Sequence, residues 1–115
     1  MLTQRLRHRI DIEALTVELD SNGVTTEEWQ TIRDSSEPDF IPAGIEPLSG
    51  REFIAAQAVQ AGVTTRITLR WREGLKPSMR IVHGDDLYNI LAILPDPTLR
   101  RHVNLMCSSG VNEGG

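Results

Sequence analysis

The sequence predicts an all-β fold, either a small β-barrel or a curled antiparallel sandwich of six or seven strands, with one short helix inserted at about residues 50–61. Short segments in which apolar and polar residues alternate recur along the chain, as is typical of half-buried strands. Turn sequences rich in Gly, Asn, Asp and Pro separate these segments. Strands do not alternate with long helical patterns, which excludes a doubly wound fold. A small sheet of this kind usually protects its edges by curling.

The chain length limits the domain organisation. With 115 residues there is room for one compact domain, predicted at residues 1–107, followed by a flexible C-terminal tail at residues 108–115. Hydrophobic residues make up 39% of the chain and aromatic residues only 4%, so aliphatic side chains must fill the core. The single Cys107 has no partner for an internal disulfide, and we expect a buried apolar role for it rather than a reactive thiol.

The charge balance favours protein partners over nucleic acid. A net charge of -4 and a pI near 5.3 lack the basic footprint that binding to a phosphate backbone needs. No apolar run approaches the roughly 20 residues of a membrane span, and Met1 to Arg9 contains no secretory apolar stretch. We therefore expect production in a cytoplasm and no membrane partner.

The first predicted strand begins near Leu6, where apolar residues fall on even positions up to Ala14. The apolar residues then move to odd positions, from Leu15 to Leu19, which predicts a bulge or bend near residues 13–15, after which the strand exchanges its faces or ends. Asp20 to Gly23 contains Asn-Gly and predicts a hairpin turn. A second strand is expected from Thr25 to Arg33.

The middle of the chain combines a loop, a third strand and the helix. Residues 34–38 form a polar loop, and residues 40–46 a short strand that Pro42 pushes towards a sheet edge. Ser49 and Glu52 match a helix capping box, in which both side chains accept from exposed backbone N–H groups. The flanking staple positions are Leu48 and Phe53, and Gly62 is placed to end the helix in a left-handed cap.

The second half of the chain is predicted to form strands. Residues 63–71 alternate without error, with one face inward and the other strongly basic. A loop over residues 73–78 leads into a hairpin built from 79–83, the turn 84–86 and 87–94. After a turn at residues 95–97, the last strand runs from Leu99 to Cys107.

The sequence contains no recognisable catalytic arrangement. No Ser, Cys or Thr is paired with an oriented base, so we expect no enzyme and no cofactor. His8, His83 and His102 lack the spacing of metal ligands, and Asp85 with Asp86 beside Gly84 is typical of a turn. We expect no metal.

Arg66, Arg70 and Arg72 form the one cluster that suggests a function, because a strand places alternate side chains on a single face. They are either a solvated face, or a subunit contact or channel wall for passing DNA. For Trp29, burial in the core is favoured over an interface anchor.

The run from Gly44 to Glu52, followed by Ala55-Ala56-Gln57, resembles the phage head-tail joining proteins, also called head closure proteins. Weaker markers agree in order along residues 5–107: Leu6 to Ile10, Glu28-Trp29, Val63 to Trp71, Pro77 to Ile81 and Tyr88 to Ile90.

This resemblance implies a structural protein of the phage or prophage head-tail connector. Such a β-barrel protein is often monomeric alone and joins a twelvefold ring of its own copies below the portal and its adaptor. The ring closes the DNA-filled head, lies near packaged DNA and docks the tail through a tail terminator or tail-completion protein. The implied location is the virion, after assembly in the host bacterial cytoplasm. The family offers no catalytic residues to transfer.

The expected partner-binding surface consists of loops, because the strands are occupied with core formation. Its residues are Ser35, Glu37 and Asp39 in the loop 34–39, Lys76 in the loop 72–78, the C-terminal tail, and the face formed by Arg66, Arg70 and Arg72. The alternative function is a small barrel that binds nucleic acid through the same arginine face, although the acidic balance counts against it.

Overall fold

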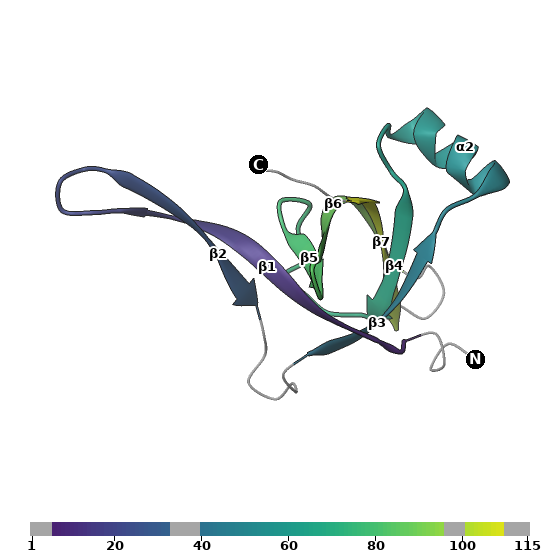
Figure 1. Cartoon of the computed structure of the whole chain (residues 1–115), viewed down its shortest axis with the longest axis horizontal. Helices are drawn as coiled ribbons and strands as arrows, with labels where there is room; N and C mark the ends of the chain where they lie inside the picture. Colours follow the sequence, from purple (N-terminus) through teal and green to yellow (C-terminus); the bar gives the residue numbers. More distant parts are fainter. Residues whose placement is uncertain (1–5, 33–39, 96–100, 110–115) are drawn as a thin grey trace.

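The structure, a computed structural model, describes residues 6–32, 40–95 and 101–109. Within these ranges the chain forms seven strands and one helix (Figure 1). In chain order they are β1 (His8–Leu19), β2 (Thr25–Ile32), β3 (Ile41–Pro47), α2 (Gly50–Val59), β4 (Thr65–Arg70), β5 (Arg80–His83), β6 (Asp86–Pro95) and β7 (His102–Ser109).

Six of the strands close into a barrel. The sheet order is β2-β1-β3-β4-β7-β6-β5, and β1 also pairs with β5, so that the sheet returns to its own beginning. Every pairing is antiparallel, and closure leaves the six barrel strands without an open sheet edge, so that β2 is the edge strand among the described residues. The predicted all-β barrel with one short helix is therefore confirmed.

The inward side chains of the barrel strands form one aliphatic core. Alternate residues along each strand point to the same side, which brings together a set with little or no exposed surface. Its members are Ile10, Ile12, Ile41, Ala43, Ile67, Leu69, Met79, Ile81, Ile90, Val103, Leu105 and Cys107.

The two halves of β1 have different partner strands. Its first half belongs to the barrel, where Ile10 and Ile12 are buried, while its second half pairs only with β2 and projects as a long hairpin (Figure 1). Of the bulge or bend predicted near residues 13–15, the bulge is wrong, because the β1–β2 register runs without a shift from Ile12–Ile32 to Leu19–Thr25. The apolar residues change parity because the strand leaves the barrel and carries them on its other face.

A bulge does occur, but in β6. The register with β7 shifts between Ile90 and Ala92, so Leu91 is an extra residue in the strand. Ile90 stays inside the barrel, whereas Ala92 and Leu94 turn to the outer surface beneath α2. Without the extra residue all three side chains would share the inner face.

Two predicted turns and one predicted strand position can be compared with the structure. Asp20 Oδ1 accepts from the N–H groups of Asn22 (2.8 Å) and Val24 (2.9 Å), and Gly23 has φ 84°, which confirms the first hairpin turn. The β5–β6 hairpin is also confirmed, with His83 opposite Asp86. The sheet-edge position predicted for the Pro42 strand is wrong, because β3 lies between β1 and β4. Pro42 pairs with Arg9 of β1 and precedes the part of β3 that pairs with β4, so its missing N–H costs no ladder bond on that side.

Two predicted element ends are refined by the structure. The predicted helix is present and ends at Val59. Gln60 at its C-cap is extended, so Gly62, with φ 96°, belongs to the following turn instead of capping the helix. Strand β7 continues through Ser109, which pairs with Tyr88, so the first two residues of the predicted tail are strand. Leu99 and residues 110–115 lie outside the described residues.

Candidate partner-binding surfaces

The arginine face predicted on β4 is broken up by ion pairs. Arg66 projects from the outer side of the barrel and contacts two carboxylates, Glu46 at 3.0 Å and Glu52 at 2.8 Å. Glu46 lies opposite Arg66 on β3, and Glu52 reaches down from α2. The hydrogen bond that the Arg66 guanidinium donates to Glu52 is the largest cause that raises the pKa of Arg66 above its ordinary value. This cation is therefore engaged within the protein.

The other two arginines differ from the strand prediction. Arg70 is exposed at the end of β4, opposite His102 of β7. Arg72 lies beyond the end of β4, in the loop that follows, and is half-buried. The prediction of one continuous basic face is wrong, because neighbouring glutamates meet Arg66 and the strand ends before Arg72.

The predicted capping box does not form. Ser49 has the extended backbone of an N-cap residue, but its side chain makes no capping hydrogen bond. Glu52 bonds to Arg66 instead of the helix N-terminus, because a guanidinium on the facing strand is the stronger partner. At the staple positions Leu48 is buried, whereas Phe53 remains 38% exposed.

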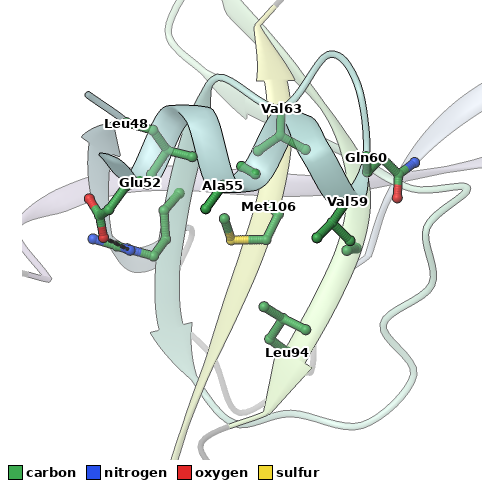
Figure 2. Close-up of a pocket in the computed structure, with 11 residues that line it drawn as sticks. Leu48, Glu52, Ala55, Val59, Gln60, Val63, Leu94 and Met106 are labelled. Atoms are coloured by element: carbon green, nitrogen blue, oxygen red, sulfur yellow. Dashed lines mark hydrogen bonds and ion pairs between the residues drawn. The ribbon is translucent and has the colours of Figure 1, made fainter. Parts of the chain in front are cut away.

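An apolar groove lies between α2 and the outer wall of the barrel (Figure 2). Its volume is about 340 Å³, and no residue of α2 is buried. Figure 2 shows Met106 of β7 on the floor, below Ala55 and Val59 of the helix, with Leu94 of β6 beside it. The remaining lining residues are Leu48, Glu52, Ala56, Gln60, Val63, Arg66 and Ala92.

Side-chain bonds at both ends hold the helix in place over this groove. At its N-terminal end Glu52 is tied to Arg66. Near its C-terminal end the Gln57 amide donates to the Val63 carbonyl and accepts from the Gly62 N–H at 3.0 Å. The helix is thus fixed by polar contacts at its ends while its apolar underside stays open.

The projecting β1–β2 hairpin carries a second apolar surface. Leu15, Val17 and Leu19 share one face, and their exposed fractions are 41%, 58% and 71%. Trp29 of β2 lies opposite Leu15 on the same face. Every residue of β2 is exposed, so the barrel does not cover this hairpin.

Trp29 anchors the base of the hairpin to the barrel. The guanidinium of Arg80 lies 4.1 Å from the centre of the Trp29 ring, and the same group contacts Glu13 of β1 at 2.7 Å. Burial of Trp29 in the core, favoured from the sequence, is wrong, because the residue is 37% exposed.

Of the predicted loop residues, the structure describes only one. Lys76 is exposed, and its carbonyl accepts from the Met79 N–H at 3.0 Å. Ser35, Glu37 and Asp39 lie outside the described residues, as does the tail beyond Ser109.

The ionisable groups considered for chemistry are placed as follows. Cys107 is fully buried, as predicted, and burial raises the pKa of its thiol to about 12. The rings of His8 and His83 meet edge to face at 5.1 Å, and burial followed by the charge of His83 lowers the pKa of His8. Over the ranges 6–32, 40–95 and 101–109, no three His, Cys, Asp or Glu residues gather in a way that could hold a metal. No described helix is long and apolar enough to cross a membrane.

Sequence reasoning placed the binding surface on loops and missed both apolar surfaces. The change of parity after Ala14 was the signal for the hairpin stripe, but it was interpreted as a bulge. The groove gave no such signal, because it is assembled from α2, β4, β6 and β7 and depends on the bulge at Leu91.

Comparisons with known proteins agree with this architecture over nearly the whole chain. Residues 1–110 match the family described as phage head completion protein. Head completion protein gp7 of Enterobacteria phage HK97 is 27% identical over 114 residues, which are 95% of this chain and 96% of that protein. A protein from Shigella flexneri 2a, solved in solution, has a TM-score of 0.75 at 24% identity and covers 98% of this chain and 100% of its own. A chain in the virion of a native gene transfer agent particle has a TM-score of 0.57 at 16% identity, covering 94% and 98%.

Proposed function

Because this chain belongs to the phage head completion protein family, we propose that it forms a ring below the portal and its adaptor, closes the DNA-filled head and docks the tail. Its role is that of a structural protein of the phage head. The family match over residues 1–110 carries the proposal, since it spans the barrel together with the hairpin and the helix.

The molecule consists of a self-contained barrel and two exposed apolar surfaces, and this arrangement supports a role as a ring component. The barrel buries its own aliphatic core, so the fold does not depend on a partner. The hairpin and the groove are left exposed, and exposed apolar patches beside polar residues mark protein interaction sites. A ring repeats each contact around a closed symmetry, so modest individual interfaces add up to a durable joint.

The proposed neighbours are the portal-adaptor ring on the head side and a tail terminator or tail-completion protein on the tail side. Copies of the chain itself complete the ring, with twelvefold symmetry, and packaged DNA lies near its channel. The protein reaches this position in the host cytoplasm and remains in the virion.

The nucleic-acid-binding alternative has less support. Of the three arginines invoked for it, Arg66 is bound to two glutamates, and the chain is acidic overall. Phosphate binding releases counterions and depends steeply on salt. A salt-sensitive shift of DNA by the isolated protein, without binding to purified portal-adaptor complexes, would favour this alternative.

Deletion of the gene, followed by electron microscopy of the particles, tests the proposed function. We expect heads without tails, either full or leaking DNA, beside separate finished tails. Expression of the intact gene in trans is the control and should restore tailed particles. Complete tailed particles in the deletion strain would refute the proposal.

A further inference from the structure

The β1–β2 hairpin and the groove beneath α2 are both exposed and apolar, and they lie far apart on the molecule. We propose that the β1–β2 hairpin of one copy docks into the groove beneath α2 of a second copy. This contact would join successive copies in the ring, and it therefore rests on the proposed function.

Neither apolar surface is covered by other described residues of the same molecule. Along the hairpin the exposed fraction rises from 41% at Leu15 to 71% at Leu19. On the groove side Val59 is 89% exposed and Leu94 50% exposed. Both surfaces offer aliphatic side chains to water, and a contact between them would remove that surface from water.

The hairpin and the groove are too far apart to touch within one molecule. The hairpin and α2 lie at opposite ends of a molecule whose longest dimension is 51 Å (Figure 1). The hairpin therefore cannot fold back onto its own groove, and the contact has to be made between copies. Two different surfaces on one subunit give a head-to-tail contact, which closes into a ring when the rotation between copies allows it.

The size of the groove suits a few side chains of a hairpin. A groove of about 340 Å³ lies at the small end of the range of about 300–1,000 Å³ typical of ligand pockets. It accommodates a few side chains rather than a folded partner. A narrow two-stranded ribbon with a row of aliphatic residues presents such side chains on a projecting support, as the face with Val17 and Leu19 does.

Charge complementarity argues that the occupant is a second copy. The hairpin between Ala14 and Ile32 contains four acidic residues and no basic residue. Glu27 lies opposite Val17 on the apolar face and Asp20 lies at the turn, whereas Glu18 and Glu28 lie on the other face. The outer faces of β4 and β7 lead from the groove floor at Met106 to Arg70 and His102, with the exposed Arg101 next to them. Over the described length of these two strands the sequence has no acidic residue.

The register allows both contacts together. Arg66 lies opposite Met106 in the groove, and Arg70 lies opposite His102 four residues along β4. Leu15 and Leu19 are also four residues apart on one strand of the hairpin. Since strands rise about 3.3 Å per residue, both distances are about 13 Å. A hairpin lying along the β4–β7 face is thus long enough to extend from the groove to the basic end.

Cysteine cross-linking in assembled particles tests the contact. The variant carries Leu19→Cys on the hairpin and Val59→Cys on the groove, both at exposed positions that do not support the core. The native Cys107 is fully buried and stays unreactive. On mild oxidation of purified particles we expect the protein to shift from the monomer band to a ladder of multiples on a non-reducing gel.

Two matched controls separate this contact from chance collisions. Thr26→Cys with Val59→Cys places the hairpin thiol opposite Glu18, on the other hairpin face. Leu19→Cys with Ile54→Cys places the helix thiol at an exposed residue outside the groove lining. Both controls should remain monomeric. A ladder of equal strength in the controls overturns the proposed contact.

The same particles distinguish the two proposals. If the cysteine variant is present in tailed particles but forms no ladder, the contact is refuted while the proposed function stands. A cross-link from Leu19→Cys to a different virion protein also refutes it, because the hairpin then docks elsewhere. If the protein is missing from particles that are nevertheless complete, the proposed function fails and the contact fails with it.

Discussion

Replacement of one leucine in the barrel and one in the hairpin should separate folding from assembly. Leu105 of β7 is fully buried, and it lies opposite Ile67 on β4 and Ile93 on β6. Leu105→Ala removes buried methyl groups and leaves a cavity in a tightly packed interior, which costs about 2–5 kcal/mol. Domains of this size are stable by only about 5–15 kcal/mol, so the loss is a large fraction of the total.

The matched control is the same substitution at an exposed site. Leu19 is 71% exposed near the end of β1. Because almost no protein surface covers it, Leu19→Ala should change the free energy of unfolding by less than about 0.5 kcal/mol. If the hairpin docks into a neighbouring copy, this variant nevertheless enters heads less efficiently than the wild type.

Urea unfolding followed by far-UV circular dichroism measures both values. The midpoint should fall clearly for Leu105→Ala and stay in place for Leu19→Ala, with the same denaturant slope for both, because the surface exposed on unfolding is little changed. Equal losses for the two variants would refute the division into a self-sufficient barrel and an unsupported hairpin. A loss below about 1 kcal/mol for Leu105→Ala would show that its site is not tightly packed.

Three further outcomes are expected. Arg66→Gln should lower the free energy of unfolding by at most about 1 kcal/mol, because its ion pairs are partly exposed, but should speed amide hydrogen exchange across α2. Burial raises the pKa of Cys107 from 9.0 to about 12, so the thiol loses its proton at a higher pH in the folded than in the unfolded protein. The resulting contribution to the free energy of unfolding is present below pH 9 and is lost as the pH rises towards 12. Unfolding curves at several pH values would measure this loss. Arg80→Ala removes the cation stacked on Trp29, and the fluorescence emission of that tryptophan should shift to longer wavelength without loss of the barrel.

The exposed apolar hairpin raises the problem of unwanted association before assembly. Edge strands are templates for pairing with other chains, and charged residues on them discourage it. Glu27 and Glu28 lie in β2, whose only partner among the described strands is β1, and Glu18 and Asp20 flank the hairpin tip. Repulsion between these like charges would discourage edge-to-edge pairing of two β2 strands.

The fold class could be predicted from the sequence because it depends on local patterns. Alternation from Val63 to Trp71 predicted the strand whose inward residues, Ile67 and Leu69, are buried. The turn residues Asp20 to Gly23 and the glycine at position 84 determined where hairpins form. Alternation has a period of two in any strand, so it identifies the inner face without knowledge of the partner strand.

Only the tertiary structure decided which exposed residues form surfaces. The same alternation continues along β1 beyond Ala14, but whether a face is covered depends on where the barrel ends, which local sequence does not encode. Glu52 looks like a capping residue until Arg66 of a distant strand lies beside it. The groove requires α2, β4, β6 and β7 to meet, with the bulge at Leu91 turning Ala92 outward. Contacts between residues far apart in the chain follow from barrel closure, and closure is a property of all six strands together.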